Sequence, residues 1–104
     1  MDYRIFMFAR FEAAPGKRDE LLNRLLEMVY LTHQETGFDH YELQVDMYDP
    51  NKFYISEIWH NQAAIDFHMQ LSHVQAILSD SKELTTSGVD ITFMHRHDHN
   101  WETP

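Results

Sequence analysis

Apolar residues recur at every second position in the first segment of the chain, residues 3–13. One face of this segment is apolar throughout: Tyr3, Ile5, Met7, Ala9 and Phe11. Phe6 and Phe8 place apolar side chains on the opposite face as well. Strict alternation predicts a β-strand, and apolar residues on both faces predict a central strand that is covered on both sides.

The pattern then changes from alternation to helical spacing. Pro15 and Gly16 indicate a turn after the first strand. An apolar stripe with the spacing of one helix face follows: Leu21, Leu22, Leu25, Leu26, Met28 and Val29. Gly37 is a residue typical of a helix C-terminus, so we predict that this helix ends near residue 36.

Two strands joined by a tight turn are predicted next. Residues 39–48 alternate with one clean apolar face, which is typical of an edge strand. The inward positions of this strand are predicted to be Tyr41, Leu43, Val45 and Met47. Pro50 and Asn51 suit a hairpin turn, and residues 52–59 form the following strand.

Helical spacing returns after Asn61, which can cap a helix N-terminus. The apolar positions of this second helical region are Ala64, Phe67, Leu71, Val74 and Leu78. Ser72 and Gln75 form a Ser-x-x-Gln capping box, so we predict a break at Leu71 and a restart after Ser72. Gly88 closes the region, and residues 89–97 form a last strand.

The predicted order of elements is strand, helix, strand, strand, helix, strand. This order is the ferredoxin-like βαββαβ arrangement, an α+β fold in which the helices cover one face of an antiparallel sheet. A second copy of the sheet is the simplest cover for the other face, which predicts a homodimer. The chain has 104 residues and no visible linker, so we expect one domain over 1–104, with a core over about 3–95 and a tail at 96–104.

Charge and composition exclude several classes of function. The formal net charge of -9 repels phosphate backbones and anionic membrane surfaces, so we expect neither nucleic-acid nor membrane binding. The chain has no cysteine, which rules out disulfides, thiolate nucleophiles and cysteine metal ligands. Arg4, Arg10 and Glu12 interrupt the apolar N-terminal segment, so we expect no signal peptide, no membrane span and a cytoplasmic location.

Candidate chemistry is concentrated in residues 55–73. Glu57 and Trp59 share a strand face with Phe53 and Ile55. A carboxyl group among such apolar side chains has a raised pKa unless a cation pairs with it, and this suits a general acid or base. A structural ion pair with Arg10, or a hydrogen bond to a helix N-terminus, is the alternative interpretation.

Three histidines lie in the same stretch. His68 follows Phe67 beside the apolar stripe of its helix, where it could transfer a proton near neutral pH or could simply be half-buried and hydrogen-bonded. His73 lies in the first turn after the helix break, where the helix dipole disfavours its charged form. A surface histidine at a helix kink is the alternative there, and His60 is expected to face solvent.

The chain ends in alternating histidines, His95, His97 and His99. These side chains could approach one metal ion if the last strand continued through them. The residues after Arg96 have the composition of a tail, however, and no carboxylate partner with a fixed spacing accompanies the histidines. We therefore predict no functional metal site.

Several motifs, taken in order, resemble the antibiotic biosynthesis monooxygenase family, which includes small quinol-monooxygenase-like proteins. The motifs are Pro15-Gly16-Lys17, Tyr41 with Leu43, Asp49-Pro50, Glu57 with Trp59, His68, and Ser72-His73. The resemblance spans roughly residues 4–95 and rests on the combined order and spacing of the motifs. It implies a dimeric α+β barrel of ferredoxin-like subunits with a pocket between sheet and helices.

The resemblance also implies a reaction. It implies oxygenation of a phenolic or quinol-type small molecule by molecular oxygen, without flavin, haem or metal. His68 or Glu57 would then be the base, and Trp59 would shape the pocket and donate its indole N–H. The substrate would contact mainly apolar and aromatic side chains: Phe6, Phe8, Phe53, Ile55, Phe67 and His73.

Other interpretations stay open. The family resembles haem-degrading enzymes, but the first strand lacks an asparagine and His68 lies too close to Trp59 for that pattern. An isomerase-like branch that acts on a phosphorylated signalling sugar fits residues 53–57 together with His68 and His73, and it would need a cation for the phosphate. A non-catalytic ligand-binding dimer is the third interpretation, which predicts no cavity beside Glu57 and His68.

Overall fold

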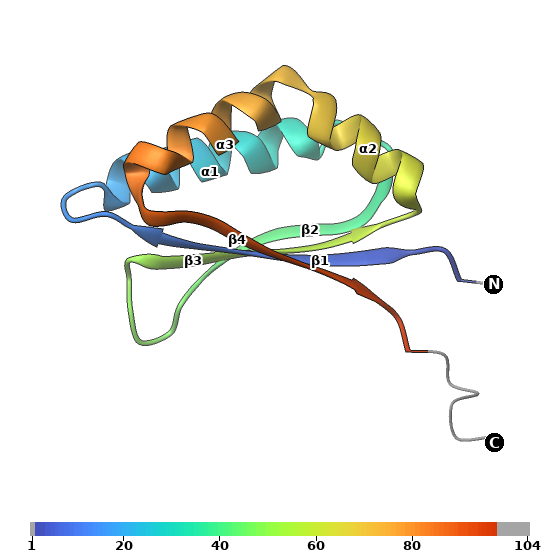
Figure 1. Cartoon of the computed structure of the whole chain (residues 1–104), viewed down its shortest axis with the longest axis horizontal. Helices are drawn as coiled ribbons and strands as arrows, with labels where there is room; N and C mark the ends of the chain where they lie inside the picture. Colours follow the sequence, from blue (N-terminus) through green and yellow to red (C-terminus); the bar gives the residue numbers. More distant parts are fainter. Residues whose placement is uncertain (1, 98–104) are drawn as a thin grey trace.

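The computed structural model describes residues 2–97. One antiparallel sheet in the strand order β2-β3-β1-β4 carries all three helices on one face (Figure 1). The elements are β1 (Ile5–Ala13), α1 (Arg18–Thr32), β2 (Phe38–Val45), β3 (Lys52–Trp59), α2 (Gln62–Gln70), α3 (Ser72–Leu84) and β4 (Thr85–His95). The predicted α+β ferredoxin-like class is therefore confirmed, with the second helical region divided into α2 and α3.

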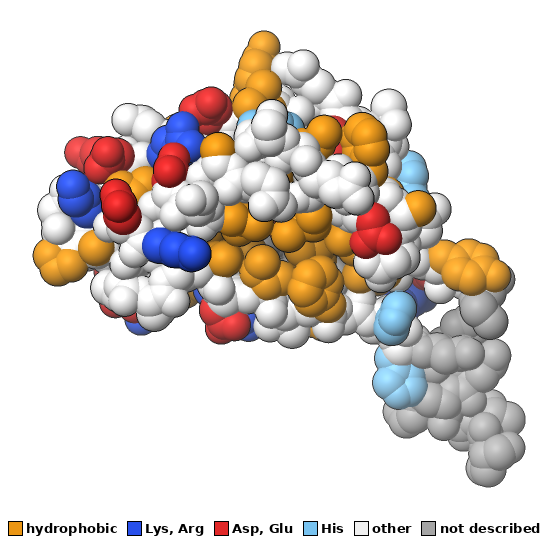
Figure 2. Space-filling model, turned by 45° about the horizontal axis from the view of Figure 1, so that its top comes forward, with side chains coloured by type: hydrophobic (Ala, Val, Ile, Leu, Met, Phe, Trp, Pro, Cys, Tyr) orange, Lys and Arg blue, Asp and Glu red, His pale blue; other side chains and the backbone are white. Residues whose placement is uncertain are grey.

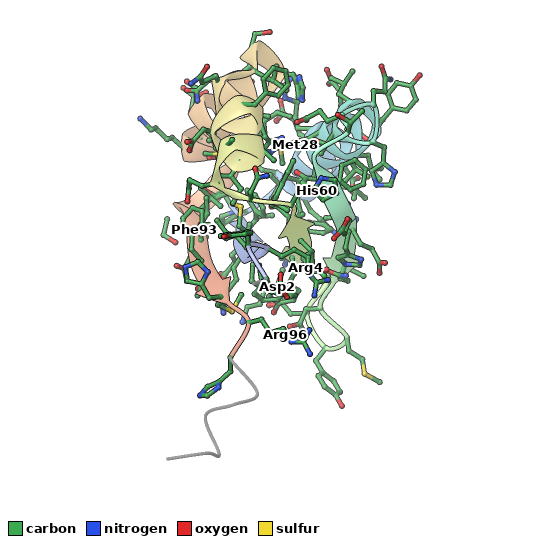
Figure 3. The ribbon with its side chains drawn as sticks, turned by 90° about the vertical axis from the view of Figure 1, so that its right-hand side faces the viewer. Asp2, Arg4, Met28, His60, Phe93 and Arg96 are labelled. Carbon is green, nitrogen blue, oxygen red and sulfur yellow. The ribbon has the colours of Figure 1, made fainter. Side chains whose placement is uncertain are left out.

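The core lies between the sheet and the helices. β1 and β3 are the two central strands, and their alternate residues are buried on the helix-facing side. Leu21, Leu25 and Met28 are buried on α1, and Met28 lies between the helices and the sheet (Figure 3). Each described helix is too short or too polar to cross a membrane.

Two of the predicted helix-to-strand boundaries differ from the structure. α1 ends at Thr32 instead of near residue 36, and an irregular segment leads into β2. β4 begins at Thr85, directly after α3, and it contains Gly88 in the left-handed region with a φ of 81°. Gly88 lies where the pairing of β1 with β4 changes register, so this glycine permits a bulge inside the strand and does not mark the strand's start.

The break between α2 and α3 is confirmed, although its cap differs from the prediction. Asn61 caps α2 as predicted, since its side chain accepts a hydrogen bond from the Ala64 backbone N–H at 3.0 Å. Leu71 has an extended backbone and is the N-cap of α3, whereas Ser72 is already helical and forms no capping hydrogen bond. The Gln75 amide instead donates to the Met69 carbonyl near the end of α2, so the predicted capping box is wrong.

The outer part of β2 is less covered than its pattern predicts. Tyr41 is buried and Leu43 is half-buried, as expected for inward positions. Val45 and Met47 were also predicted to face the core, but their exposed fractions are 52% and 86%. β2 ends at Val45, and the β2–β3 hairpin then points away from the helices, so these two side chains have no helix to pack against (Figure 1).

The opposite face of the sheet is not covered by any described helix (Figure 1). It carries half-buried aromatic and aliphatic side chains: Phe6, Phe8, Tyr54 and Ile58. Phe8 stacks on Tyr54 at 5.5 Å between ring centroids, and the Arg10 guanidinium lies 4.8 Å from the centre of the Phe8 ring. The predicted central position of β1 is confirmed, but its second apolar face meets no other layer within the described chain.

The ends of β1 and β4 meet at one ion-pair cluster. The Arg4 guanidinium donates to the Asp2 carboxylate at 2.9 Å, and Arg96 lies 3.7 Å from the same carboxylate (Figure 3). These side chains are at least one-third exposed, so the cluster contributes little to stability.

Gly37 marks a close approach between the α1–β2 segment and α2. A Cβ atom placed on Gly37 would lie 2.7 Å from the Ala64 Cβ, which is shorter than any normal contact. We expect Gly37→Ala to lower the free energy of unfolding by about 1–3 kcal/mol, the usual range for overpacking. Urea denaturation followed by circular dichroism would measure the change.

Adding Ala64→Gly to Gly37→Ala is the matched control for this steric argument. The second change removes the methyl group in the way, so the double variant should recover part of the lost stability beyond the effect of Ala64→Gly alone. Purely additive effects of the two substitutions would contradict the contact.

Candidate active site

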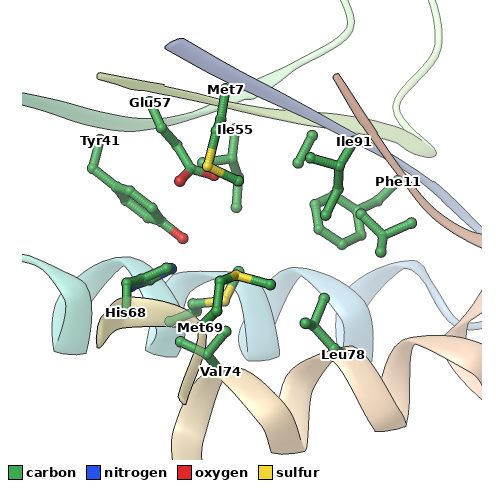
Figure 4. Close-up of a pocket in the computed structure, with 13 residues that line it drawn as sticks. Met7, Phe11, Tyr41, Ile55, Glu57, His68, Met69, Val74, Leu78 and Ile91 are labelled. Atoms are coloured by element: carbon green, nitrogen blue, oxygen red, sulfur yellow. The ribbon is translucent and has the colours of Figure 1, made fainter. Parts of the chain in front are cut away.

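Three polar side chains from different elements converge between the sheet and the helices (Figure 4). Tyr41 on β2 and Glu57 on β3 are direct cross-strand partners, so both point from the sheet toward the helices. His68 reaches the same space from α2. Inward-facing positions on two strands and one helix therefore bring together residues that are far apart in sequence.

Glu57 is a buried carboxyl group with a single hydrogen-bond donor. Glu57 is 5% exposed. The Trp59 indole N–H donates a hydrogen bond to Glu57 Oε1 at 2.7 Å. Burial raises the pKa of Glu57 to about 7, the Trp59 hydrogen bond opposes that rise, and the charge of Glu35 adds to it. The alternative interpretation of Glu57 as the partner of Arg10 is wrong, because Arg10 lies on the opposite face beside Asp90.

His68 is a buried histidine whose orientation is fixed by a second carboxylate. Its Nδ1 lies 2.9 Å from Glu35 Oε2, and its ring lies 4.4 Å from the Trp59 ring between centroids. Burial lowers the pKa of His68, Glu35 opposes this effect, and His73 adds to it. A neutral His68 donates from Nδ1 to the carboxylate, which leaves Nε2 as the proton acceptor.

Tyr41 adds a phenol that stays protonated. Burial raises the pKa of Tyr41 far above its ordinary value, and the nearby charge of Glu57 raises it further. The hydroxyl is buried and makes no hydrogen bond of standard geometry, although the nearby Thr32 side chain partly opposes the rise in the pKa of Tyr41. Tyr41 is therefore an O–H donor directed at the space between the sheet and α2 (Figure 4).

A cavity of about 20 Å³ lies among these groups (Figure 4). Its polar lining consists of Tyr41, Glu57 and His68. The other lining residues are apolar: Met7, Ala9, Phe11, Met28, Ile55, Met69, Val74, Leu78, Val89 and Ile91. The cavity has room for about one water-sized molecule.

The apolar lining continues to the surface between α3 and β4. Leu78 on α3 and Ile91 on β4 line the cavity and are only half-buried. In the space-filling view, hydrophobic side chains gather in the middle of the face that these two elements border (Figure 2). This side of the molecule, between α3 and β4, is here called the mouth.

The structure brings together some of the predicted site residues and separates others. Ile55, Glu57 and His68 line the cavity, and Trp59 lies immediately behind them through its contacts with both polar groups. Phe53 is buried on the same sheet face but lies outside the lining. Glu57, Trp59 and His68 thus form one cluster, as their residue types suggested.

The remaining predicted substrate contacts lie elsewhere. Phe6 and Phe8 lie on the uncovered sheet face, because neighbouring residues of a strand point to opposite sides. Phe67 is 61% exposed, although His68 beside it is buried, because successive helix residues point in different directions. Phe67 and half-buried His73 line a separate surface cleft.

Glu35 is the site residue that the sequence analysis missed. It lies after α1, in a segment that was predicted to be helical, and no spacing rule relates it to His68. Tyr41 was recognised only as an inward-facing strand residue. The one available signal was that Tyr41, like Glu57, occupies an inward position of a strand in a predicted hairpin, so the two could have been paired.

The C-terminal histidines form no cluster within the described residues. β4 ends at His95, so His97 is not on the strand, and His99 lies outside the part that the structure describes. Among residues 2–97, no three histidine or acidic side chains are close enough together to hold a metal ion.

Comparison with known proteins places the chain in one family. The family model described as antibiotic biosynthesis monooxygenase matches residues 4–79. A protein of Bacillus subtilis (strain 168) named "Putative monooxygenase YcnE" is 30% identical over 87 residues, which cover 84% of this chain and 92% of that protein.

Solved structures agree with this relationship. PA3566 from Pseudomonas aeruginosa superposes with a TM-score of 0.85 at 28% identity, covering 94% of this chain and 98% of that one. Rv0793 from Mycobacterium tuberculosis superposes with a TM-score of 0.85 at 26% identity, covering 92% and 97% of the two chains. The chain therefore belongs to the antibiotic biosynthesis monooxygenase family.

Proposed function

We propose that this protein is a monooxygenase that oxidises a phenolic or quinol-type aromatic substrate with molecular oxygen and without a cofactor. The observation that carries the proposal is an apolar cavity whose only polar lining groups are Tyr41, Glu57 and His68. These groups include a proton acceptor and two proton donors. Membership of the monooxygenase family supports the same reaction class.

His68 is the proposed base. A phenol at the cavity gives its O–H proton to His68 Nε2, while Nδ1–H remains bound to Glu35. Burial keeps His68 neutral and able to accept the proton, because it lowers the pKa of the imidazole. The resulting phenolate is electron-rich enough to transfer one electron to molecular oxygen.

The radical pair then combines, and a C–O bond forms on the ring. The resulting peroxide anion takes up one proton. The ring hydrogen at that carbon then leaves as a proton while the O–O bond breaks, and this proton and the departing hydroxide form water, which leaves a carbonyl group. One oxygen atom thus enters the product and the other becomes water. Tyr41 and protonated Glu57 are donors that can stabilise the negative charge on oxygen during these steps.

A substrate ring must enlarge the cavity, because about 20 Å³ holds only a water-sized molecule. Met7, Met28 and Met69 line the cavity, and methionine side chains repack readily because they are unbranched and flexible. We propose that the ring enters through the mouth between α3 and β4 and displaces these side chains.

The alternative activities are less well supported. An isomerase acting on a sugar phosphate would need a cationic subsite, and the described lining of the cavity contains neither lysine nor arginine. A purely binding role predicted that Glu57 and His68 would leave no cavity beside them. The two groups have separate partners, Trp59 and Glu35, and a cavity lies between them.

Oxygen uptake by the purified, chelator-treated protein would test the proposed reaction. The substrates would be a panel of dihydroxynaphthalenes and anthrones, and the variants would be His68→Asn and Glu57→Gln. We expect substrate-dependent uptake by the wild type that persists with chelator and is lost in His68→Asn. His60→Asn is the matched control, because His60 is exposed and lies outside the cavity lining.

Uptake no faster than spontaneous oxidation across the whole panel would overturn the oxygenase proposal. Substrate-dependent uptake that is equal in His68→Asn and the wild type would support the oxygenase reaction but show that His68 is not its base.

We also propose that the protein is a homodimer that pairs the uncovered sheet faces. Phe8, Tyr54 and Ile58 are half-buried on that face although no described helix covers them. Phe8→Glu should place a charge in the interface and convert a dimer into a monomer in sedimentation-velocity experiments. Tyr30→Glu, at an exposed aromatic residue on α1, should leave the dimer intact, and a Phe8→Glu dimer would contradict this interface.

A further inference from the structure

Glu35 contacts the buried site through His68 and also lines a cleft at the surface. Its side chain is only 8% exposed, although it lies in the segment between α1 and β2. One carboxylate oxygen, Oε2, lies 2.9 Å from His68 Nδ1. The other oxygen, Oε1, is buried and has no hydrogen-bond partner among the described residues.

The side of Glu35 away from the cavity borders a surface cleft of about 460 Å³. Phe67, Leu71 and His73 line this cleft together with Glu35. His73 Nε2 is a second buried polar atom at this cleft without a hydrogen-bond partner in the described chain. Buried polar atoms are normally hydrogen-bonded, so two unpartnered ones beside one cleft require a reason.

We propose that Glu35 is a proton relay that carries protons between His68 and solvent in this cleft, with His73 as the receiving group at the cleft. The inference rests on the proposed function, because it assigns a route for the proton that the base removes from the substrate. Glu35 does not line the cavity and acts only through His68.

The route is balanced proton by proton. His68 Nε2 takes the substrate proton and becomes an imidazolium, whose Nδ1 then gives its own proton to Glu35 Oε2. The neutral Glu35 acid releases a proton from its carboxyl group to a water molecule that enters from the cleft. His73, which also lines the cleft but is not hydrogen-bonded to Glu35, can take the proton from that water. The carboxylate is restored, and His68 is left neutral with its proton on Nε2. When His68 later gives that proton to the peroxide oxygen, Nδ1 takes a proton back from solvent through Glu35. The imidazole thereby returns to its Nδ1–H form, and the full cycle releases no net proton.

The route does not compete with the mouth. In the proposed function, substrate and oxygen approach Glu57 and His68 from the side of α3 and β4, whereas the cleft that Glu35 lines shares no lining residue with the cavity. Protons therefore leave while the mouth is occupied by the substrate.

Groups on every neighbouring element influence this relay. Glu57 on β3 and Tyr41 on β2 face the relay from the sheet, and the charge of Glu35 raises the pKa of each. His73 on α3 disfavours a positive charge on His68, whereas Glu35 favours it. A change at Glu35 is therefore expected to alter the titration of His68 itself.

Histidine side-chain NMR tests the relay without a substrate. In the wild type, His68 should be the Nδ1–H tautomer, with an Nδ1 proton that exchanges with solvent through Glu35. Glu35→Gln preserves the shape and the hydrogen bond but cannot carry a proton. We expect slower exchange of the Nδ1 proton and a lower pKa of His68 in that variant, because the attraction of Glu35 for the imidazolium is lost.

Turnover supplies the second measurement. We expect kcat of Glu35→Gln to fall on the order of 10²-fold, the lower end of the range for proton-transfer groups, and to recover when formate or imidazole is added. The kcat of Glu35→Asp should lie between those of the wild type and Glu35→Gln, because aspartate can carry a proton but has a shorter side chain. Glu83→Gln, at an exposed glutamate on α3, should behave like the wild type.

The outcomes separate the relay from the proposed function. Slower His68 exchange in Glu35→Gln without turnover of any substrate would support the relay and overturn the oxygenase reaction. Unchanged exchange and an unchanged His68 pKa in both Glu35 variants would overturn the relay even if the protein is an oxygenase. A fall in kcat that no added acid or base rescues would assign Glu35 a purely structural role.

Discussion

Replacing Glu57 by glutamine should raise the free energy of unfolding by about 3 kcal/mol at pH 8 and leave it nearly unchanged at pH 4. Burial raises the pKa of Glu57 from 4.5 to about 7 in the folded protein. A tenfold change in the proton affinity of one group on folding corresponds to about 1.4 kcal/mol. Glutamine has no charge to bury, and its side-chain oxygen can still accept the Trp59 hydrogen bond.

The sign of the pH effect follows from proton binding. Between pH 4.5 and about 7 the unfolded chain has lost the Glu57 proton, whereas the folded protein still holds it. The folded state binds more protons in this range, so the wild type loses stability as the pH rises. The glutamine variant has no such group, and the difference between the two proteins should therefore grow from pH 4.5 to about 7 and then stay constant.

Urea denaturation of both proteins across this pH range would measure the difference. The lowered pKa of His68 acts in the opposite direction, because its contribution is lost as the pH falls, but it is present in both proteins. Glu42→Gln, at an exposed position of β2, is the control and should show no such dependence. Parallel stability curves for wild type and Glu57→Gln would mean that Glu57 titrates normally.

Replacing Trp59 by alanine should lower the free energy of unfolding by about 3–5 kcal/mol, the range measured for large buried aromatic residues. Trp59 is fully buried, at 0% exposed. Its ring lies 6.1 Å from the rings of Phe38 and Tyr41 and 4.4 Å from the ring of His68, between centroids. The substitution therefore leaves a cavity in the centre of the site.

Trp59→Phe separates packing from hydrogen bonding. Phenylalanine keeps most of the ring contacts but removes the N–H that donates to Glu57. That hydrogen bond opposes the rise in the pKa of Glu57, so the pKa should move above 7 in Trp59→Phe. Carboxyl-carbon NMR would follow the titration, and an unchanged pKa would show that the indole N–H does not control Glu57.

The sequence was sufficient for the architecture because that information is local. The alternating apolar residues of β1 and β3, the Asn61 cap and the break at Leu71 each depend on a few neighbouring residues. The errors occur where tertiary contacts override local preference. Val45 lies at an inward position of the alternating pattern, but β2 extends past the helices there and Val45 is exposed. Ser72 is a residue type that often caps helices, but Leu71 is the N-cap of α3.

The candidate site could be predicted only in part. Glu57, Trp59 and His68 were found because a carboxyl group and a histidine stand out in apolar patterns. Glu35 was missed because its role comes from one contact with His68 across a gap of 33 residues, which no spacing rule encodes. Phe6 and Phe8 were assigned to the substrate because two apolar faces of β1 cannot be told apart by pattern alone.

The mouth and the polar cluster occupy different parts of the chain, and this division has an evolutionary consequence. The hydrogen-bonded groups come from β2, β3, α2 and the segment before β2, whereas the mouth is formed by α3 and β4. Mutations at Leu78, Val89 or Ile91 can thus change which molecules enter while the buried hydrogen bonds stay intact. Under the proposed function, descendants of one ancestor can in this way acquire new substrates while they inherit the same proton-transfer groups.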